Sequence, residues 1–458
     1  MRLAWYSPLP PQRSGIADYS AELLPALARE APDLAIELVV DDGVRPAPAL
    51  AARFPVHGAR ALPGLLAAGR FDLVLYHLGN NRDFHAGIYR ALLEHPGVVV
   101  LHEVVLHHLV RDVTLYAGDP DAYARELAYA YGRTGEALAR RALATGVPLE
   151  PWSAPLFERV VDRSLGVIVH NDYVRRRVLA SRPLSRLAVV PHHLDLGGSL
   201  GEASPPDREA ARDAQGLPAG AFVVASFGFF TAAKRPEILL RAFARLRRER
   251  PEAVLVLAGE VSPHYDFARV FTPDLRAGVT ITGRLELPDF LRWMAACDIA
   301  VNLRHPTAGE TSGTLIRLLG MGRPVIVSRA GAFAEIPDGA CAKVDVDDSE
   351  EELLLAYLLR LAADPGLRRA MGENARAYVA AHHTLAGSAR AYAAFLRDTV
   401  AAKPEPFDAR PPLLPYPEDD LLTDLAREVT TELVDLGAGE ADDDLLRAVA
   451  EGIAGLGL

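Results

Sequence analysis

The amino-acid sequence predicts an α/β protein with two tandem Rossmann-like domains facing each other across a cleft, followed by a helical C-terminal tail. Short apolar runs alternate with amphipathic helical stretches over most of the chain, which favours parallel sheets covered by helices on both faces. A Gly/Ser/Pro-rich stretch, LDLGGSLGEASPPDREA, interrupts this alternation once, and the alternation then restarts. The length of 458 residues also fits two to three domains.

The first domain is predicted over residues 1–195. Its strand-like runs are RLAWYS, FDLVLYHLG, GVVVLHE, LGVIVHN and LAVVPHH, and each ends in polar or glycine residues. The loop after the first run leads into a helical stretch, IADYSAELLPALARE. Residues 196–220 are predicted to form the linker.

The second domain is predicted over residues 221–385. It begins with AFVVASFGFF and continues through AVLVLAGE, GVTITGR, IAVNLR and PVIVS, with helical stretches between these runs. Residues 372–399 predict one long helix or two short ones, and we assign residues 386–403 as a C-terminal helix. Residues 404–458 are a Pro-rich segment and an acidic tail with two amphipathic helical patterns.

The composition excludes several classes of protein. The formal net charge of −11 argues against nucleic-acid binding, and we interpret the basic stretch Arg241–Arg250 as the solvent side of a helix. No apolar run reaches the length of a membrane span, and the start MRLAWYS lacks the pattern of a signal peptide. Cys297 and Cys341 do not suggest a disulfide framework, and we interpret Cys297 as a core residue. We therefore expect a cytoplasmic location.

Polar residues follow the strands of the first domain, where a parallel sheet places its binding site. Gly15 stands where a loop becomes a helix, so its backbone could approach an anion, although a simple turn glycine explains it equally well. Asn80, His85, His102 and Glu103 lie near strand ends and could hold sugar hydroxyls. We assign Asn80, His85 and Glu103 to the acceptor side.

Two cations follow the first strand of the second domain. Lys234 and Arg235 stand at the start of a helix, and cations beside free helix N–H groups suit a diphosphate. A pair of solvated surface cations is the competing interpretation.

The loop that begins GETSG raises a second possibility for ligand binding. Thr311, Ser312 and Gly313 open a helix, and capping explains Thr311 or Ser312 without a ligand. Capping does not explain Glu310, whose carboxylate could accept two sugar hydroxyls. Arg304 precedes this loop, just after a strand.

We predict no metal site. The DVDD at residues 345–348 imitates an Asp-x-Asp motif, but a helix follows it, and we predict a capping box from Ser349 and Glu352. The pairs His107-His108 and His192-His193 lack the spacing of metal ligands.

Taken together, these segments resemble the GT-B glycosyltransferases of family 4, a retaining group that uses nucleotide-sugar donors. The matching pieces span residues 1 to about 395 and include SGIADYS, LHE, GVIVHNDYV, FGFFTAAKRPEILLRAF, LVLAGE, ITGRLELPDFLRWMAACDIAVNLR and GETSGTLIRLLGMGRPVIVS. The resemblance implies an acceptor domain at residues 1–195 and a nucleotide-sugar donor domain at residues 221–385.

The resemblance also implies roles for individual residues. Glu310 would hold the donor hexose, the amides of Thr311, Ser312 and Gly313 would meet the phosphates, and Lys234 and Arg235 would stabilise the leaving diphosphate. His102 would position the sugar through its backbone or its ring. Further donor-binding residues would be Gly15, Gly228, Gly283, Arg284, Arg304, Gly309 and Arg317.

The sequence departs from the family pattern at two places. The family has a second Glu after the first, and the position counted back from Gly-Arg-Pro is Arg317 here, so Arg317 pairs with a helix neighbour, points at the ribose or contacts a phosphate. We expect a subgroup with GETSG in place of the usual Glu-x7-Glu motif. The family often has Arg after the glycine of its phosphate loop, whereas Phe229 follows Gly228 here, and Arg235 could supply the missing cation.

The expected activity is transfer of a hexose, with retention at the anomeric carbon, to a glycan, lipid-linked or small-molecule acceptor in glycan biosynthesis. The donor would be a UDP or GDP sugar, with no other cofactor and no metal. Two alternatives stay open: a GT-B-like nucleotide-sugar epimerase, and a non-catalytic nucleotide-sugar-binding or scaffold protein. Peripheral membrane contact also stays open, and nucleic acid is not an expected partner.

Overall fold

The chain divides into two compact units, which we describe separately. The computed structural model describes residues 1–194, 207–218 and 220–407, and in the tail residues 429–430, 432–433, 439 and 442–454. The first unit is Met1–Pro191 with Ala308–Thr311 and Ala386–Leu458, and the second is His192–Thr307 with Ser312–Leu385. Most of the predicted linker and most of the predicted tail lie outside the described residues.

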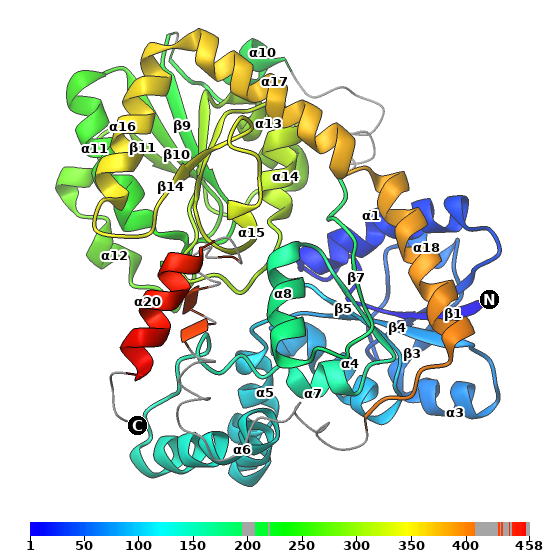
Figure 1. Cartoon of the computed structure of the whole chain (residues 1–458). Coiled ribbons are helices and arrows are strands. Elements are labelled where there is room, and N and C mark those ends of the chain that lie inside the picture. Colours follow the sequence, from blue (N-terminus) through cyan, green and yellow to red (C-terminus); the bar gives the residue numbers. More distant parts are fainter. Residues whose placement is uncertain are drawn as a thin grey trace. The chain divides into compact units, whose positions relative to one another are not determined.

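The first unit contains a seven-stranded parallel sheet in the order β3-β2-β1-β4-β5-β6-β7 (Figure 1). Its strands are β1 (Arg2–Tyr6), β2 (Ala35–Val40), β3 (Val56–Gly58), β4 (Leu73–Leu78), β5 (Val98–Leu101), β6 (Gly166–Val169) and β7 (Leu187–Val189). Its helices are α1 (Gly15–Glu30), α2 (Pro48–Ala51), α3 (Leu62–Ala67), α4 (Arg82–Glu94), α5 (His107–Val113), α6 (Pro120–Thr145), α7 (Glu158–Asp162), α8 (Asp172–Ser181), α18 (Leu385–Ala402) and α20 (Asp443–Ala454).

The second unit contains a six-stranded parallel sheet in the order β11-β10-β9-β12-β13-β14. Its strands are β9 (Phe222–Phe227), β10 (Ala253–Ala258), β11 (Val279–Ile281), β12 (Ile299–Asn302), β13 (Val325–Ser328) and β14 (Ala342–Val344). Its helices are α10 (Arg208–Ala214), α11 (Pro236–Glu249), α12 (Phe267–Val270), α13 (Leu287–Ala296), α14 (Gly313–Gly320), α15 (Gly331–Ala334), α16 (Glu350–Ala363) and α17 (Pro365–His382). The predicted pair of Rossmann-like parallel sheets is confirmed.

The central strands read as continuous apolar runs because helices cover both of their faces. Every residue of β4, β5, β9 and β12 is buried. The covering helices are amphipathic: α11 buries Leu239, Phe243 and Leu246. Its arginines point outward, and Arg241 and Arg245 pair with glutamates at the start of α16. The interpretation of this basic stretch as a solvent face is confirmed.

Side-chain caps join several strands to their following helices through short loops. Ser14, Asn81, Asn171 and Ser312 accept hydrogen bonds from the first-turn N–H groups of α1, α4, α8 and α14, at 2.8–3.2 Å. A cap of this kind fixes where the helix begins and how its free N–H groups point. The loops at the carboxyl ends of these strands therefore have defined geometry.

The predicted capping box at α16 is wrong. Ser349 is the N-cap residue, but its side chain makes no cap hydrogen bond to the helix. Its hydroxyl and its N–H instead both donate to Asp347 Oδ1, at 2.6 and 2.8 Å. Asp347 competes for the hydroxyl because its carboxylate lies only two residues away and forms a local turn.

Two further observations bear on the predictions from composition. Cys297 and Cys341 are both buried and unpaired with each other, as small core residues. Among the described residues, no helix has the length and apolar character needed to cross a membrane.

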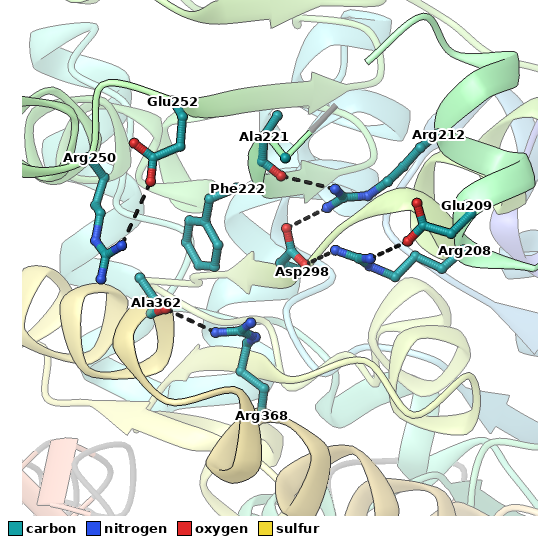
Figure 2. Close-up of a pocket in the computed structure, with 11 residues that line it drawn as sticks. Arg208, Glu209, Arg212, Ala221, Phe222, Arg250, Glu252, Asp298, Ala362 and Arg368 are labelled. Carbon is teal, nitrogen blue, oxygen red and sulfur yellow. Dashed lines mark hydrogen bonds and ion pairs between the residues drawn. The ribbon is translucent and has the colours of Figure 1, made fainter. Parts of the chain in front are cut away.

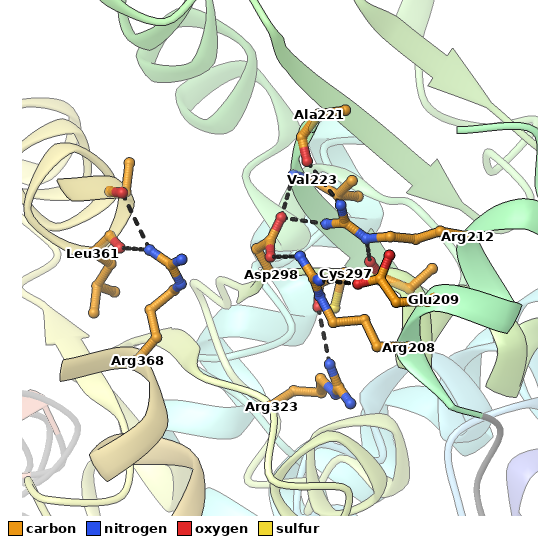
Figure 3. A network of polar contacts seen from close by, with 12 residues as sticks. Arg208, Glu209, Arg212, Ala221, Val223, Cys297, Asp298, Arg323, Leu361 and Arg368 are labelled. Atoms are coloured by element: carbon orange, nitrogen blue, oxygen red, sulfur yellow. Dashed lines mark hydrogen bonds and ion pairs between the residues drawn. The ribbon is translucent and has the colours of Figure 1, made fainter. Parts of the chain in front are cut away.

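A buried charge network anchors α10 to the amino edge of the second sheet (Figure 3). Asp298, just before β12, accepts from Arg212 and Arg208 at 2.5 Å each and from Val223 N at 2.8 Å. Arg212 also donates to the carbonyls of Ala296 and Ala221. The side chains of Asp298 and Arg212 are only 6% and 8% exposed, so the buried Arg212 guanidinium depends on the Asp298 carboxylate for its compensation.

We expect Asp298→Ala to lower the free energy of unfolding by about 3–5 kcal/mol, because it leaves the Arg212 guanidinium buried without its carboxylate. Urea denaturation of the two proteins measures this change. The matched control is Asp289→Ala, which removes an exposed partner of Arg292 on α13 and should cost less than about 1 kcal/mol. Equal losses in the two variants would contradict the role of the Asp298 network.

Candidate active site

The topology selects two loops in each sheet as candidate sites. In a parallel sheet of this kind, ligands bind at the carboxyl edge beside the point where the strand order reverses. That point lies between β1 and β4 in the first unit and between β9 and β12 in the second. The loops after β9 and β12 contain Gly228, Arg304 and Gly309 of the predicted donor-binding residues, and the loops after β1 and β4 contain Gly15 and Asn80.

A glycine and a lysine meet after β9. Gly228 has a φ of 99°, which only glycine adopts without strain, and a Cβ there would lie 3.0 Å from Lys234 Nζ. Lys234 Nζ donates to the Phe227 carbonyl at 2.5 Å, and the hydroxyl of Thr314 would lie 3.9 Å from the same Cβ. Gly228, Lys234 and the first turn of α14 therefore surround one small space in the second unit.

Gly259, which the sequence analysis did not single out, makes this approach feasible. It follows β10 with a φ of 150°, and a Cβ there would lie 2.0 Å from the Gly228 carbonyl oxygen. Any side chain at residue 259 would therefore displace the Gly228 loop. The LAGE segment was the only signal of this requirement in the sequence.

Arg235, predicted to contact the diphosphate together with Lys234, forms an ion pair in this structure. Its guanidinium forms a bidentate ion pair with Glu350, the buried first residue of α16. Arg235 itself is the N-cap residue of α11 and has a φ of 53°. The predicted role of Arg235 as a diphosphate ligand conflicts with this ion pair, which already neutralises its charge.

The first turn of α14 gathers several polar groups. Ser312 caps the helix and also accepts from Asn302 Nδ2 at 3.3 Å. Arg317 folds back along its own helix and donates to the Gly313 carbonyl at 3.4 Å. A Cβ at Gly313 would lie 3.2 Å from Arg317 Nη1 and 3.4 Å from His192 Nε2. Arg317 therefore lies beside the N-terminus of α14, where an anion would be stabilised.

Three other predicted donor-binding residues lie around this edge of the second sheet. The Arg304 N–H donates to the Ser328 hydroxyl at 2.9 Å, which ties the loop after β12 to the end of β13. Gly283 has a φ of 67° after β11, and the Arg284 side chain is exposed. These contacts place Arg304 next to the switch point and Gly283 and Arg284 at the far strand of the sheet.

The short segment Ala308–Thr311 packs with the first unit. Glu310 Oε2 accepts from the Ala308 N–H at 2.9 Å, which folds this carboxylate back over its own loop. Asn171 Nδ2 donates to the Gly309 carbonyl at 2.8 Å and to the Thr311 hydroxyl at 3.0 Å. Asn171, which sequence reasoning missed, therefore holds the loop that carries Glu310.

Asn80 and Glu103 form a polar hub after β4 and β5. Glu103 Oε1 accepts from the Asn80 N–H at 2.7 Å. The Asn80 side chain contacts His108 Nδ1 at 2.9 Å and accepts from the Leu109 N–H at 2.9 Å. The hub fixes the start of α5 against the end of β4. Gly15, the first residue of α1, has open space where a Cβ would stand.

His85 of α4 is a buried base near this hub. It is 1% exposed, and a Cβ at Gly79 would lie 3.0 Å from its Nε2. Burial lowers the pKa of His85 to about 4, and a hydrogen bond to the backbone of His77 partly opposes that shift. His85 is therefore neutral at neutral pH.

His102, at the end of β5, is in contact with two other histidines. Its two ring nitrogens lie 3.0 Å from His77 Nδ1 and 3.1 Å from His170 Nε2. Its backbone N–H donates to the Leu78 carbonyl at 3.0 Å. The ring is thus embedded between two other histidines, which the sequence analysis did not connect with it.

A pocket in the second unit lies at the opposite edge of its sheet (Figure 2). It is bordered by Phe222, at the start of β9, and by Asp298, just before β12, with Arg208, Arg250 and Arg368 around it. Arg368 donates to the Ala362 carbonyl at 3.2 Å, which caps the end of α16. These contacts hold helices to the sheet. The pocket lies where strands β9 and β12 begin, whereas the candidate site lies where they end.

Comparisons with known proteins identify the family. A family described as "Glycosyl transferases group 1" matches residues 221–364. A D-inositol 3-phosphate glycosyltransferase from Mycolicibacterium vanbaalenii is 30% identical over 338 residues, which are 68% of this chain and 71% of the relative. The chain belongs to the group 1 glycosyltransferases.

Other relatives match over shorter segments. A GDP-mannose-dependent monoacylated alpha-(1-6)-phosphatidylinositol monomannoside mannosyltransferase from Corynebacterium glutamicum is 30% identical over 187 residues, 39% of this chain and 48% of the relative. A lipopolysaccharide core biosynthesis mannosyltransferase from Rhizobium leguminosarum is 33% identical over 218 residues, 45% of this chain and 59% of the relative. The chain thus spans about half to three fifths of the length of these two relatives.

Solved structures show the fold. Sucrose-phosphate synthase from Thermosynechococcus elongatus superposes with a TM-score of 0.62 at 17% identity, over 88% of this chain and all of that chain. Anabaena HepE in complex with UDP and glucose gives a TM-score of 0.59 at 17% identity, over 87% of this chain and all of that chain. The two Rossmann-like domains are those of the GT-B fold.

The pKa of His85 predicts a pH dependence of stability. The unfolded chain binds a proton at His85 near pH 6.5 and the folded chain only near pH 4, so acidification through this window favours unfolding. Between pH 6.5 and pH 5, His85 should account for a loss on the order of 2 kcal/mol. Urea denaturation at both pH values should show a smaller loss in His85→Phe than in the unsubstituted chain.

The exposed His264 provides the matched control for this measurement. His264→Phe should lose as much stability on acidification as the unsubstituted chain. An identical loss in His85→Phe and His264→Phe would show that His85 is not the group responsible.

Proposed function

We propose that this protein transfers a hexose from a nucleotide-diphosphate sugar to an acceptor hydroxyl, with retention of the anomeric configuration. The observation that carries the proposal is the cluster of Gly228, Lys234 and the first turn of α14 at the switch point of the second sheet. A cation and free helix N–H groups that converge beside two glycine-lined turns suit a diphosphate.

The chemistry needs no protein nucleophile in this proposal. The bond between the anomeric carbon and the diphosphate breaks, a new bond to the acceptor oxygen forms on the same face, and the departing phosphate takes the hydroxyl proton. The protein would stabilise the leaving diphosphate through Lys234 and the N-terminus of α14. Glu310 would orient the hexose through its hydroxyls, held in place by the loop that Asn171 binds.

Arg317 is the second cation of the site in this proposal. Its guanidinium lies at the Gly313 end of the same helix turn that Lys234 approaches from the Gly228 side. Arg317 thus suits a phosphate contact better than a ribose contact, because it lies beside the helix N–H groups. Arg235 takes no part, since Glu350 binds it.

The names of the relatives guide the choice of probes. One relative is named for GDP-mannose, and the Anabaena HepE structure contains UDP, so both nucleotides belong in the first binding experiment. Several relatives are named as D-inositol 3-phosphate glycosyltransferases, which makes D-inositol 3-phosphate the first acceptor to try. Calorimetry with UDP, GDP and ADP tests whether a nucleoside diphosphate binds at all.

Lys234→Ala should weaken binding of the preferred nucleoside diphosphate by about 1.5–3 kcal/mol, which is about 10- to 150-fold in Kd, because a charge-assisted contact is lost. Isothermal titration calorimetry measures the difference. The exposed Lys403 supplies the control, and Lys403→Ala should bind the nucleotide as the unsubstituted chain does. An unchanged Kd in Lys234→Ala would remove this lysine from the site.

Glu310→Ala should abolish sugar transfer while the bare nucleoside diphosphate still binds, because Glu310 contacts the hexose and not the phosphates in this proposal. Product release from the matching nucleotide sugar measures transfer, and calorimetry measures binding. Glu249→Ala, on the exposed end of α11, is the control. Full activity in Glu310→Ala would refute the proposed role, whereas loss of nucleotide binding would place Glu310 on the phosphates instead.

A further inference from the structure

Three histidines lie in a row at the carboxyl edge of the first sheet. His77 is near the end of β4, His102 follows β5, and His170 follows β6. The three strands are neighbours in the sheet, and β7 lies next to β6. The parallel arrangement therefore brings residues that are 25 and 68 positions apart in sequence into contact.

The contacts between these rings form a continuous chain of hydrogen bonds, here called the chain of histidines, across four strands. His77 Nδ1 lies 3.0 Å from His102 Nε2, and His102 Nδ1 lies 3.1 Å from His170 Nε2. His170 Nδ1 lies 2.9 Å from the carbonyl oxygen of Val190, the residue after β7. All of these distances are those of ordinary hydrogen bonds.

The carbonyl at one end fixes the direction of every bond. A carbonyl only accepts, so the proton of His170 must be on Nδ1. In neutral His170, Nε2 then carries a lone pair, and His102 Nδ1 must be the donor to it. His102 Nε2 in turn accepts from His77 Nδ1. All three rings are therefore the Nδ1–H tautomer, which is the less populated form of free neutral histidine.

Aromatic side chains pack around the three histidines and hold their rings in place. Trp5 of β1 stacks on His77 with centroids 4.5 Å apart. Tyr19 of α1 meets His102 edge-on at 5.0 Å and lies 5.1 Å from His170. The Tyr19 hydroxyl is 2.8 Å from that of Tyr392 in α18, whose ring is parallel to His77.

Other titratable groups of the first unit lie on the elements around these rings. Glu103 follows His102 directly and accepts from the Asn80 N–H. On α1, Asp18 and Glu22 flank Tyr19 in sequence, and His85 of α4 bonds the backbone of His77 as a neutral base. Tyr19 and Tyr392 keep their protons, because burial raises the pKa of both hydroxyls. The two tyrosines therefore take no part in proton uptake near neutral pH.

We propose that His77, His102 and His170 act as one proton-binding unit, in which His77 and His170 are positioning residues that hold the His102 ring in a single tautomer and orientation. The hydrogen-bonding part of this proposal is independent of the proposed function. Only the positioning of His102 for sugar transfer rests on that function.

While both N···N hydrogen bonds are kept, the three histidines can hold one extra proton and no more. A first proton on any of the three rings leaves both N···N bonds intact, since the neutral neighbours change tautomer to match. Two extra protons on adjacent rings would make two N–H groups face each other. Two on the outer rings would require His102 to have no proton at all. The three residues therefore titrate as a coupled unit with one macroscopic step.

Nuclear magnetic resonance of the full chain labelled with ¹⁵N-histidine tests the proposal without an activity assay. Above the titration, the ¹⁵N shifts of all three rings should report the Nδ1–H tautomer. On acidification, the three rings should change together with one midpoint and take up one proton in total. An Nε2–H tautomer at any of the three, or three separate midpoints, would overturn the proposal.

Substitutions at His170 extend the test. His170→Phe removes the end of the chain, so the His102 and His77 signals should shift toward the Nε2–H tautomer. In His170→Gln, the amide can donate to the Val190 carbonyl and accept from His102 Nδ1, so the Nδ1–H tautomer should return. If His170→Phe folds and the tautomers of His102 and His77 do not change, the proposed hydrogen bonding between the three histidines is contradicted.

His107 provides the matched control. It is also buried, its Nδ1 lies 2.6 Å from the Ala154 carbonyl and its Nε2 lies 2.9 Å from the Tyr123 hydroxyl, but it is not in contact with the chain. His107→Phe should lower stability and leave the tautomers and the midpoint of the three histidines unchanged. If His107→Phe changed the tautomers of the three histidines as much as His170→Phe does, a general packing effect and not the hydrogen bond to His170 would explain the result.

Enzyme kinetics then test the positioning role of His170 separately from the hydrogen bonding between the three histidines. With an acceptor in hand, His170→Phe should lower kcat on the order of 10²-fold with little change in the KM for the donor, and His170→Gln should recover most of it. Confirmed tautomers with an unchanged kcat would refute the positioning role and leave the proton-binding unit standing. If the tautomers are confirmed but neither the unsubstituted protein nor any variant transfers sugar, the proposed function is refuted and the proton-binding unit is not.

Discussion

The constraint on which the rest of this structure depends is the common direction of the strands in each sheet. Because all strands of a sheet are parallel, their carboxyl ends meet at one edge, and so do the loops that follow them. Residues far apart in the sequence thereby become neighbours there. Lys234 meets Thr314 across Gly228 in this way, and His77 meets His102 and His170. The opposite edge has buried charge pairs that hold helices in place, such as Asp298 with Arg212.

The candidate site shows how few groups such an edge needs. In the proposed site, one lysine, one arginine and the first turn of one helix would supply the positive potential for a diphosphate. Two glycines with positive φ, Gly228 and Gly259, let backbone segments come close enough for these groups to converge. Asn171 and Glu350 have a different part: the first holds the Glu310 loop, and the second binds Arg235. Neither would be found by a search for residues that touch a ligand.

Local features of the fold could be predicted from the sequence because they depend on near neighbours. The alternation of apolar runs and amphipathic stretches gave the two parallel sheets, since strands buried on both faces need continuous apolar runs. The solvent face of α11 and the burial of Cys297 were predicted for the same reason. The capping box at Ser349 failed, because Asp347 offers a nearer acceptor that the capping pattern does not consider.

The amino-acid pattern alone was enough to predict two α/β domains and to place Lys234 and the GETSG loop after strands. Which polar residues come into contact became known from the three-dimensional fold. It paired Arg235 with Glu350, laid Arg317 against Gly313, and enclosed His102 between His77 and His170. The physical reason is that hydrogen bonds and ion pairs act over about 3–4 Å. Their partners come from other strands and helices, so strand order and helix packing select them, and no local pattern records that selection.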